Sequence, residues 1–214
     1  MENRMIKVYA KDSSKTALHA AQGHFATRHS HINYYIDITS IKTRAEEAEH
    51  AASVFAGKFT NISTVDTIVC MDRTEVIGAY LARIMDKDSM KMTTNQHGTI
   101  YVVSPEFDTN GQMIFRDNNV PAIRGKHILL LLATATTGIT IRRCLECVQY
   151  YGGTVEGIAS VFSTAKSVDG YPVEAIFNGD DLPGYATYSQ KECPMCAAGQ
   201  PLEAMVNGFG YSKL

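Results

Sequence analysis

A continuous apolar run from Ile128 to Leu132 is the clearest feature in the hydrophobic pattern of the chain. The run is too short to cross a membrane, and it suits a strand that is buried on both faces. Small and hydroxyl side chains follow over residues 133–140. A helical spacing of apolar residues comes next, in Ile141, Cys144, Leu145 and Val148, and Gly152-Gly153 ends it. The pattern therefore predicts a strand, a turn and a helix between His127 and Gly153.

Strand-like and helix-like segments alternate along much of the remaining chain. Helices are predicted over residues 16–24, 40–59 (with Ser40 as a possible N-cap) and 76–85. Strands are predicted over 65–70, 99–104, 154–163 and 172–177, and a turn and a short strand over 25–39. Residues 86–98 read as a polar loop, and Asn110-Gly111 as a hairpin signal. Such alternation predicts an α/β fold with a parallel sheet, whose ligands bind beyond the carboxyl ends of the strands.

Two segments lie at such strand ends and carry candidate chemistry. A strand followed by a hydroxyl-rich turn and a helix can hold a phosphate, because backbone N–H groups and the positive helix end point at the ligand. Thr136, Thr137 and Thr140 fit this interpretation better than that of an ordinary helix start, for which threonine is also suited. In the second segment, Asp72 and Glu75 stand three residues apart. This spacing fits either a helix capping box or a loop that binds a metal ion or a pyrophosphate.

Composition and charge narrow the class of protein. The formal net charge is −2 and the isoelectric point is near 6.4, which argues against a nucleic-acid-binding protein, because there is no basic surplus to neutralise phosphates. The opening residues are charged and lack an apolar segment, so we expect neither a signal peptide nor a membrane anchor. An odd number of cysteines, five, is then typical of reduced thiols in the cytoplasm.

The cysteines and histidines leave alternatives open. Cys144 and Cys147 form one CxxC motif, and Cys193 and Cys196 form another, so a four-cysteine zinc site is one interpretation and structural thiols or a redox pair the other. The second motif is the more suggestive, because the first lies on the apolar face of a predicted helix. Three histidines between residues 24 and 31 would either bind a metal or substrate or serve as half-buried hydrogen-bonding groups. Arg142 and Arg143 are interpreted as a solvated helix face.

At this point the residues resemble the type I phosphoribosyltransferase family, and within it the orotate phosphoribosyltransferases. The resemblance implies a central parallel sheet flanked by helices, with an amino-terminal hood over residues 1–40, a core over 41–180 and an irregular tail over 181–214 in a single domain. It implies that the 5-phosphate of phosphoribosyl pyrophosphate (PRPP) is held by Ala135, Thr136, Thr137, Gly138, Ile139 and Thr140. The pyrophosphate side would be lined by Met71, Asp72, Arg73, Thr74 and Glu75, and the nucleobase would lie near Arg28 and Tyr35 in the hood.

Three departures from the family pattern bear on activity. Leu132 and Ala133 stand where the family carries two adjacent acidic residues for the ribose hydroxyls, and their side chains accept no hydrogen bond. The family's basic loop has no counterpart after Val103, so a cation from elsewhere would have to replace it, the candidates being Lys91, Arg116, Arg124 and Lys126. Ile139 replaces a glycine of the phosphate loop, which narrows the space there.

Two functions therefore follow from the resemblance. One is transfer of phosphoribose to orotate or another nucleobase, which would use Mg²⁺. The other is a non-catalytic sensor that binds PRPP or a nucleoside monophosphate, and the missing acidic pair and basic loop favour it. Family members are commonly dimers, so a homodimer is expected, with a small-molecule partner, no nucleic acid and no membrane.

Overall fold

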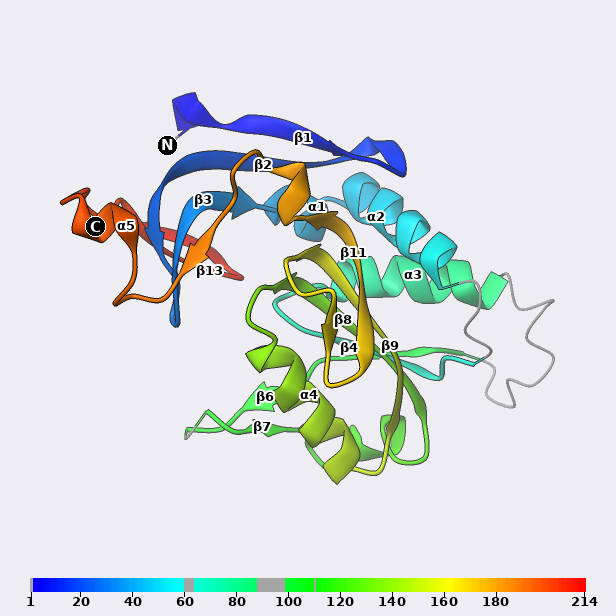
Figure 1. Cartoon of the computed structure of the whole chain (residues 1–214). Coiled ribbons are helices and arrows are strands. Elements are labelled where there is room, and N and C mark those ends of the chain that lie inside the picture. Colours follow the sequence, from blue (N-terminus) through cyan, green and yellow to red (C-terminus); the bar gives the residue numbers. More distant parts are fainter. Residues whose placement is uncertain (1, 60–63, 88–98, 110) are drawn as a thin grey trace.

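The core of the molecule is a mostly parallel sheet in the strand order β10-β11-β9-β8-β4-β5 (Figure 1). A computed structural model describes residues 2–59, 64–87, 99–109 and 111–214 of the chain. The parallel strands are β4 (Thr67–Cys70), β5 (Tyr101–Val103), β8 (His127–Ala135), β9 (Thr154–Ser163) and β11 (Tyr171–Asn178), and the short β10 (Ser167–Val168) runs antiparallel at the edge. The predicted α/β fold with a parallel sheet is confirmed.

Helices cover both faces of this sheet, as buried strands require. On one face lie α1 (Thr39–Thr43), α2 (Ala45–Lys58) and α3 (Glu75–Lys87), which share a core cluster with Phe55, Ile77 and Leu81. On the other face lies α4 (Ile139–Tyr150), whose Ile141, Cys144 and Val148 pack in a second cluster. Figure 1 shows α4 on the opposite side of the sheet from α2 and α3. None of the helices in the described ranges is long and apolar enough to span a membrane.

A second sheet, called the hood sheet below, combines the two ends of the chain. Its strand order is β12-β3-β2-β13-β14, with β1 paired to β2. The strands are β1 (Ile6–Ala10), β2 (Ser13–Ala26), β3 (His31–Asp37), β12 (Thr187–Tyr188), β13 (Ala204–Asn207) and β14 (Gly210–Lys213). In Figure 1 the red carboxyl-terminal strands lie beside the blue amino-terminal ones, because β13 runs parallel to the end of β2.

Two predictions about these terminal segments are wrong. Residues 16–24 are not a helix but part of β2, and the buried Thr16, Leu18 and Ala20 recur at the period of two that a strand requires. Residues 181–214 are not an irregular tail, because they form β12, the short helix α5 (Pro194–Ala197), β13 and β14. The Gly- and Pro-rich composition of this segment reflects its turns, and its strands are stabilised by pairing with the distant amino terminus.

Three local predictions concern a helix start, a hairpin and a loop. Ser40 is not an N-cap, since α1 begins at Thr39, whose N–H donates to Asp37 Oδ1 at 2.9 Å. A hairpin does occur around Asn110-Gly111, between β6 (Glu106–Phe107) and β7 (Met113–Ile114), although Asn110 itself lies outside the described residues. Most of the polar loop predicted over 86–98 lies outside them as well, and its first two residues belong to α3. Short 3-10 turns occupy Glu2–Arg4, Val120–Ala122 and Gly179–Asp181.

Candidate functional site

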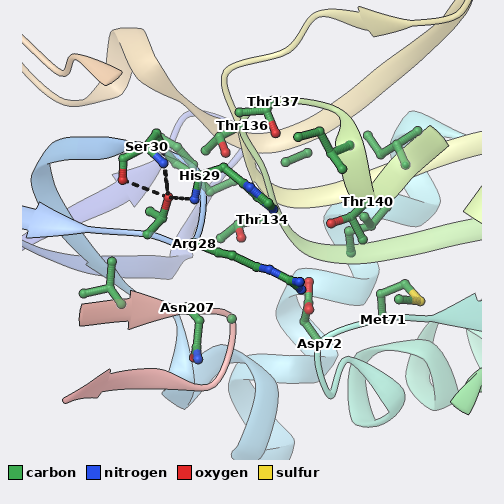
Figure 2. A pocket seen from close by; sticks show the side chains of 18 of the residues that line it. Arg28, His29, Ser30, Met71, Asp72, Thr134, Thr136, Thr137, Thr140 and Asn207 are labelled. Carbon is green, nitrogen blue, oxygen red and sulfur yellow. Dashed lines mark hydrogen bonds between the residues drawn. The ribbon is translucent and has the colours of Figure 1, made fainter. Parts of the chain in front are cut away.

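A cavity of about 400 Å³ lies between the hood sheet and the carboxyl ends of β4 and β8. This is the position at which an open parallel sheet binds ligands. Its walls come from four separated parts of the chain: the β2–β3 loop and β3, the turn after β4, the β8–α4 loop, and the β13–β14 turn. Figure 2 shows side chains from these parts pointing into one space.

The β8–α4 loop forms one wall of the cavity, and all of its predicted phosphate-binding residues line it: Ala135, Thr136, Thr137, Gly138, Ile139 and Thr140. Gly138 is the residue before the helix and has a φ of 72°, in the left-handed region that favours glycine. A Cβ atom at this position would also lie 2.9 Å from Cγ2 of Val168. No side chain in the described chain caps the start of α4, so the N–H groups of its first turn face the cavity as anion donors.

The neighbouring strand holds this loop in place. Thr164 Oγ1 donates to the carbonyl of Thr136 at 3.1 Å, and the backbone N–H of Thr164 donates to the carbonyl of Ala135 at 2.9 Å. Ser163 Oγ donates to the same carbonyl of Ala135 at 3.0 Å. These bonds use the loop's acceptors and leave its threonine hydroxyls directed at the cavity, as Figure 2 shows for Thr136 and Thr140. The loop is therefore fixed before any ligand arrives.

The turn after β4 divides into a part that lines the cavity and a part that does not. Met71 and Asp72 line it, whereas Arg73, Thr74 and Glu75 lie outside. Thr74 is buried, and its hydroxyl donates to the carbonyls of Met71 and Leu131. Arg73 packs on the ring of Phe209 with 4.8 Å from its guanidinium carbon to the ring centroid, and Glu75 accepts a hydrogen bond from Ser104 at 2.6 Å.

Asp72 does not cap a helix, so the capping-box interpretation of Asp72 and Glu75 is wrong. Helix α3 begins at Glu75, and Asp72 has a φ of 55°, outside the extended region of an N-cap residue. Asp72 is instead the acidic side chain that lines the cavity within the described chain. Burial raises the pKa of its carboxyl group, and the ammonium group of Lys42 opposes that rise.

Lys42 connects two walls of the cavity, and no sequence pattern pointed to it. Its side chain is buried, and Nζ donates to the carbonyl of Asp72 at 3.0 Å and to the carbonyl of Gly208. Desolvation lowers the pKa of this ammonium group. Because its two acceptors lie 136 residues apart in the chain, in the turn after β4 and in the β13–β14 turn, Lys42 fixes the carboxyl-terminal turn against the core.

The β2–β3 loop supplies the cationic side of the cavity. The hydroxyl of Thr27 accepts the N–H groups of His29 at 3.2 Å and Ser30 at 2.9 Å, which closes a tight turn. Arg28 projects from this turn, and in Figure 2 its guanidinium group points toward the carboxylate of Asp72 across the cavity. Tyr35 lines the cavity from β3, and burial is the main cause that raises the pKa of its hydroxyl, followed by the nearby Asp37 and Tyr211. The structure thus brings both predicted hood residues, Arg28 and Tyr35, to the cavity.

Several lining residues were missed or misinterpreted at the level of sequence. Arg143 lines the cavity, so the interpretation of Arg142 and Arg143 as one solvated face is wrong for Arg143. Arg142 points away and pairs with Asp169 at 3.1 Å. His29 also lines the cavity, as do Asn207, Gly208 and Phe209 from the β13–β14 turn. Nothing in the local sequence of that turn signals this position, which results from pairing of β13 with β2.

The described cations named as replacements for the family's basic loop do not reach the cavity. Arg116 is paired with Glu106 at 2.8 Å within the β6–β7 hairpin. Arg124 and Lys126 precede β8, whose opposite end forms the phosphate loop, roughly 25 Å away at about 3.3 Å per residue. Lys91 lies outside the described residues. The cations that line the cavity within the described chain are Arg28 and Arg143.

The two positions of the missing acidic pair are apolar and fully buried. Leu132 and Ala133 both have 0% exposure, and they end the hydrophobic part of β8. Thr134 follows them and lines the cavity with its hydroxyl (Figure 2). A ribose in this space would meet hydroxyl groups in place of carboxylates.

The cysteine motifs separate in space. Cys144 and Cys147 belong to the core cluster under α4, where Cys147 Sγ donates to the carbonyl of Met113 at 3.5 Å. Cys193 and Cys196 lie instead beside His24 and His31 of the hood sheet, and ligand atoms of these four residues are all within 4.8 Å of one another. The four-cysteine site is therefore wrong, because its two halves do not meet.

No protein-family model matches the chain. Curated proteins do: it is 29% identical over 111 residues to an orotate phosphoribosyltransferase of Caldanaerobacter subterraneus subsp. tengcongensis, which covers 48% of this chain and 56% of that protein. It is 27% identical over 142 residues to an orotate phosphoribosyltransferase of Thermotoga maritima, covering 60% of this chain and 74% of that one. The chain thus spans little more than half the length of the first relative.

The names of these relatives agree with the parallel sheet and flanking helices described above. The chain is similar in sequence to orotate phosphoribosyltransferases, and its fold is that of the type I phosphoribosyltransferases. The solved structure of Leishmania donovani UMP synthase superimposes with a TM-score of 0.57 at 16% identity, over 76% of this chain and 34% of that one. The solved structure of an adenine phosphoribosyltransferase of Thermoanaerobacter pseudethanolicus superimposes with a TM-score of 0.51 at 15% identity, over 83% of this chain and 96% of that one, and shows the same fold.

Proposed function

We propose that this phosphoribosyltransferase-family protein binds a ligand carrying a ribose 5-phosphate, either a nucleoside monophosphate or PRPP. The observation that carries the proposal is the start of α4, which presents uncapped N–H groups and threonine hydroxyls to a cavity of about 400 Å³. A helix start of this kind attracts a dianionic phosphate through its dipole and its free donors.

The remaining walls suit the rest of such a ligand. Arg143, one turn into α4, adds a positive charge beside the loop, and Arg28 supplies a second from the hood. A guanidinium group binds a phosphate by two parallel hydrogen bonds. Tyr35 and Phe209 offer aromatic surface near Arg28, where a nucleobase would lie if the phosphate occupies the loop.

The alternative to simple binding is transfer of phosphoribose to orotate or another nucleobase, which the names of the curated relatives favour. Such transfer requires Mg²⁺ in this family. Asp72 is the carboxylate available to it, and one carboxylate suffices when phosphate oxygens and waters supply the other positions. The buried Leu132 and Ala133 count against turnover, since neither side chain orients the ribose hydroxyls. We therefore favour a binding function, as in a nucleotide or PRPP sensor, over a catalytic one.

Calorimetric titration of uridine 5′-monophosphate, orotidine 5′-monophosphate, adenosine 5′-monophosphate and PRPP tests the proposal. We expect at least one of them to bind, and Arg143→Gln to weaken its binding by about tenfold or more, because a hydrogen bond to a charged group contributes about 1.5–3 kcal/mol. Arg142→Gln is the matched control, since Arg142 lies on the same helix but pairs with Asp169 outside the cavity. Equal effects of the two variants, or binding of none of the four ligands, would overturn the proposal.

A second assay separates sensor from enzyme. The protein is incubated with PRPP, Mg²⁺ and each nucleobase in turn, and release of pyrophosphate is followed. Turnover that Thr137→Val abolishes would establish the transferase and refute the sensor. Tight binding of a monophosphate without pyrophosphate release would refute the transferase.

A further inference from the structure

The side chains of His24, His31, Cys193 and Cys196 converge on one point at the edge of the hood sheet, away from the cavity. His24 comes from β2 and His31 from β3, while Cys193 is the N-cap residue of α5 and Cys196 lies within that helix. His24, His31 and Cys193 are buried and Cys196 is exposed. A buried imidazole or thiol group carries a nitrogen or sulfur atom that is removed from water. Such an atom is expected to have a hydrogen-bond or metal partner, so a buried group of this kind requires an explanation.

The distances within this cluster are those of a tetrahedron around an ion. His24 Nε2 and His31 Nδ1 lie 3.2 Å apart, and Cys196 Sγ lies 3.2 Å from His31 Nδ1 and 3.6 Å from His24 Nε2. Cys193 Sγ lies 3.5 Å from His24 Nε2. With Zn–N and Zn–S bonds of about 2.05 and 2.3 Å, a tetrahedral site separates two nitrogens by about 3.3 Å and a nitrogen from a sulfur by about 3.6 Å.

The orientation of His24 also suits a ligand. Its Nδ1 lies 2.8 Å from the carbonyl oxygen of Gln200 and must carry the proton to donate to it. The other nitrogen, Nε2, then bears a lone pair directed at the cluster. A backbone carbonyl that fixes the tautomer in this way is the usual outer partner of a metal-bound histidine.

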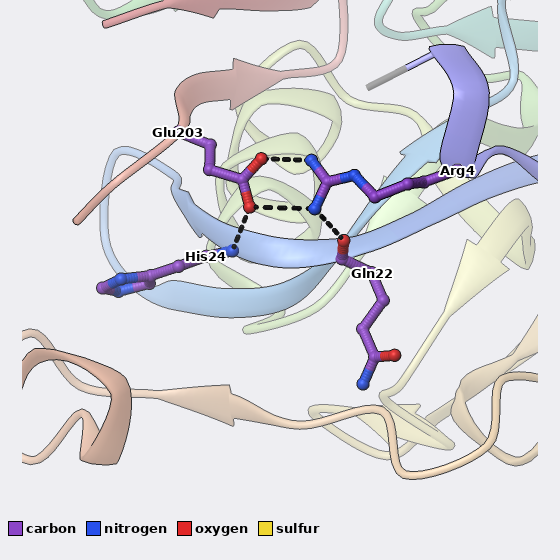
Figure 3. A network of polar contacts seen from close by, with 4 residues as sticks. All are labelled: Arg4, Gln22, His24 and Glu203. Carbon is purple, nitrogen blue, oxygen red and sulfur yellow. Dashed lines mark hydrogen bonds and ion pairs between the residues drawn. The ribbon is translucent and has the colours of Figure 1, made fainter. Parts of the chain in front are cut away.

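The backbone of His24 is held as firmly as its ring. Its N–H donates to Glu203 Oε1 at 3.4 Å, and the N–H of Glu203 donates to the carbonyl of His24 at 2.9 Å. Glu203 is paired in turn with Arg4, which also donates to the carbonyl of Gln22 at 3.1 Å. Figure 3 shows this network, with the imidazole of His24 pointing away from it.

From this geometry we infer that the protein carries a structural Zn²⁺ ion bound by His24 Nε2, His31 Nδ1 and the thiolates of Cys193 and Cys196. Two nitrogens and two sulfurs in tetrahedral arrangement select zinc among the common metals, and four protein ligands leave no open position for catalysis. Binding releases two thiol protons to solvent, and two thiolates then balance the two charges of the ion. A neutral site suits a cluster that is mostly buried.

The ion links segments that the cavity needs. His24 and His31 stand on either side of the β2–β3 loop, which carries Arg28 and His29 into the cavity. Cys193 and Cys196 belong to the segment that leads into β13, whose following turn supplies Asn207 to Phe209. The zinc site therefore fixes two of the cavity's walls to each other from behind.

Metal analysis of the full-length protein, purified from cells grown with added zinc, tests the site. We expect about one zinc per chain, and a loss of nearly all of it in Cys196→Ser and in His31→Asn. Cys147→Ala is the matched control, a cysteine of the other CxxC motif, and it keeps its zinc. Less than half an equivalent in the unaltered protein, or full zinc in Cys196→Ser, would overturn the inference, and so would an equal loss in Cys147→Ala.

Two further measurements cover the case in which a variant does not fold. Exchange of the bound metal for Co²⁺ in the unaltered protein should give intense visible ligand-field bands and a thiolate charge-transfer band. Weak bands typical of six-coordinate cobalt would refute the site. Chelation of the ion should also speed amide hydrogen exchange in residues 24–31 and 204–213 and leave exchange in β8 unchanged. Exchange that is the same with and without chelator would refute the role of the ion in joining these segments.

Discussion

The two CxxC motifs have the same spacing and different surroundings. Cys144 and Cys147 face inward from α4, among Ile141, Val148 and Ile158, and serve as small apolar side chains. Cys193 precedes the four-residue helix α5 and Cys196 lies within it, and both meet two imidazole rings from the hood sheet. The comparison shows that thiol spacing alone does not define a metal site. The remaining ligands and their orientation define it, and they come from residues about 170 positions away.

The largest expected difference between the two motifs is in how the free energy of unfolding changes when a chelator removes zinc. Zinc present at 100 times its dissociation constant adds about 2.7 kcal/mol to the free energy of unfolding, because it binds only the folded chain. We expect removal of zinc to lower this free energy by at least about that amount in the unaltered protein and in Cys147→Ala. Cys193→Ala should be less stable from the start and should not respond to chelator. Urea unfolding with and without chelator measures the difference, and a chelator response in Cys193→Ala would contradict the assignment.

Thiol reactivity should sharpen the same contrast. Burial raises the pKa of Cys147 to about 11 and of Cys70 to about 12, and it raises that of Cys144 as well. These thiols therefore stay protonated and unreactive at pH 7.5. Their pKa is higher in the folded chain than in the unfolded chain, so their contribution to stability is lost as the pH rises above the unfolded pKa and through the folded pKa, which is about 11 for Cys147 and about 12 for Cys70. Titration with a disulfide reagent at pH 7.5 should find two of the five cysteines reactive after chelation and almost none before. A third fast-reacting thiol would show that one of Cys70, Cys144 and Cys147 is not buried as described.

The smallest expected effect concerns the support of the zinc site. A Cβ atom on Gly23 would clash with Glu203 Oε1 and lie 2.8 Å from Cζ of Phe25, so Gly23→Ala must displace the carboxylate that accepts the N–H of His24, the Phe25 ring, or both. Loss of an outer-shell partner typically weakens metal binding by about 10- to 100-fold. We expect a weakening at the lower end of that range, measured by competition with a chromophoric chelator. Gly57→Ala is the control, because a Cβ there meets nothing within 4 Å, and a similar change in both variants would refute the role of Glu203.

The sequence predicted those parts of the fold that depend on local pattern. The apolar run before Thr134, the small and hydroxyl residues after it and the helical spacing that follows were sufficient to predict β8, the turn and α4. Residues 16–24 were predicted incorrectly, because small and apolar residues such as Ala17, Leu18 and Ala20 suit a helix as well as a strand. Pairing with β1 and β3 on either side decided in favour of the strand.

The residues around the cavity also differ in how far the sequence predicts them. Thr136, Thr137 and Thr140, which line the cavity, could be found from sequence because they lie close together in one turn between a strand and a helix. Arg143 could not be distinguished from Arg142, since the two are adjacent and only the packing angle of α4 directs one to the cavity and the other to Asp169. Lys42 could not be found at all, because its importance comes from two carbonyls that are distant in the chain.

By itself the sequence determined the α/β class, the strand, turn and helix from β8 to α4, and the apolar side chains at Leu132 and Ala133. Each is written in consecutive residues whose backbone geometry follows from local sterics and hydrophobic burial. Only the tertiary structure decided which cysteine motif meets histidines and which turn closes the cavity. Those outcomes depend on β13 running beside β2, a pairing of the two chain ends that is specified by complementary hydrogen-bonding edges and not by any local pattern.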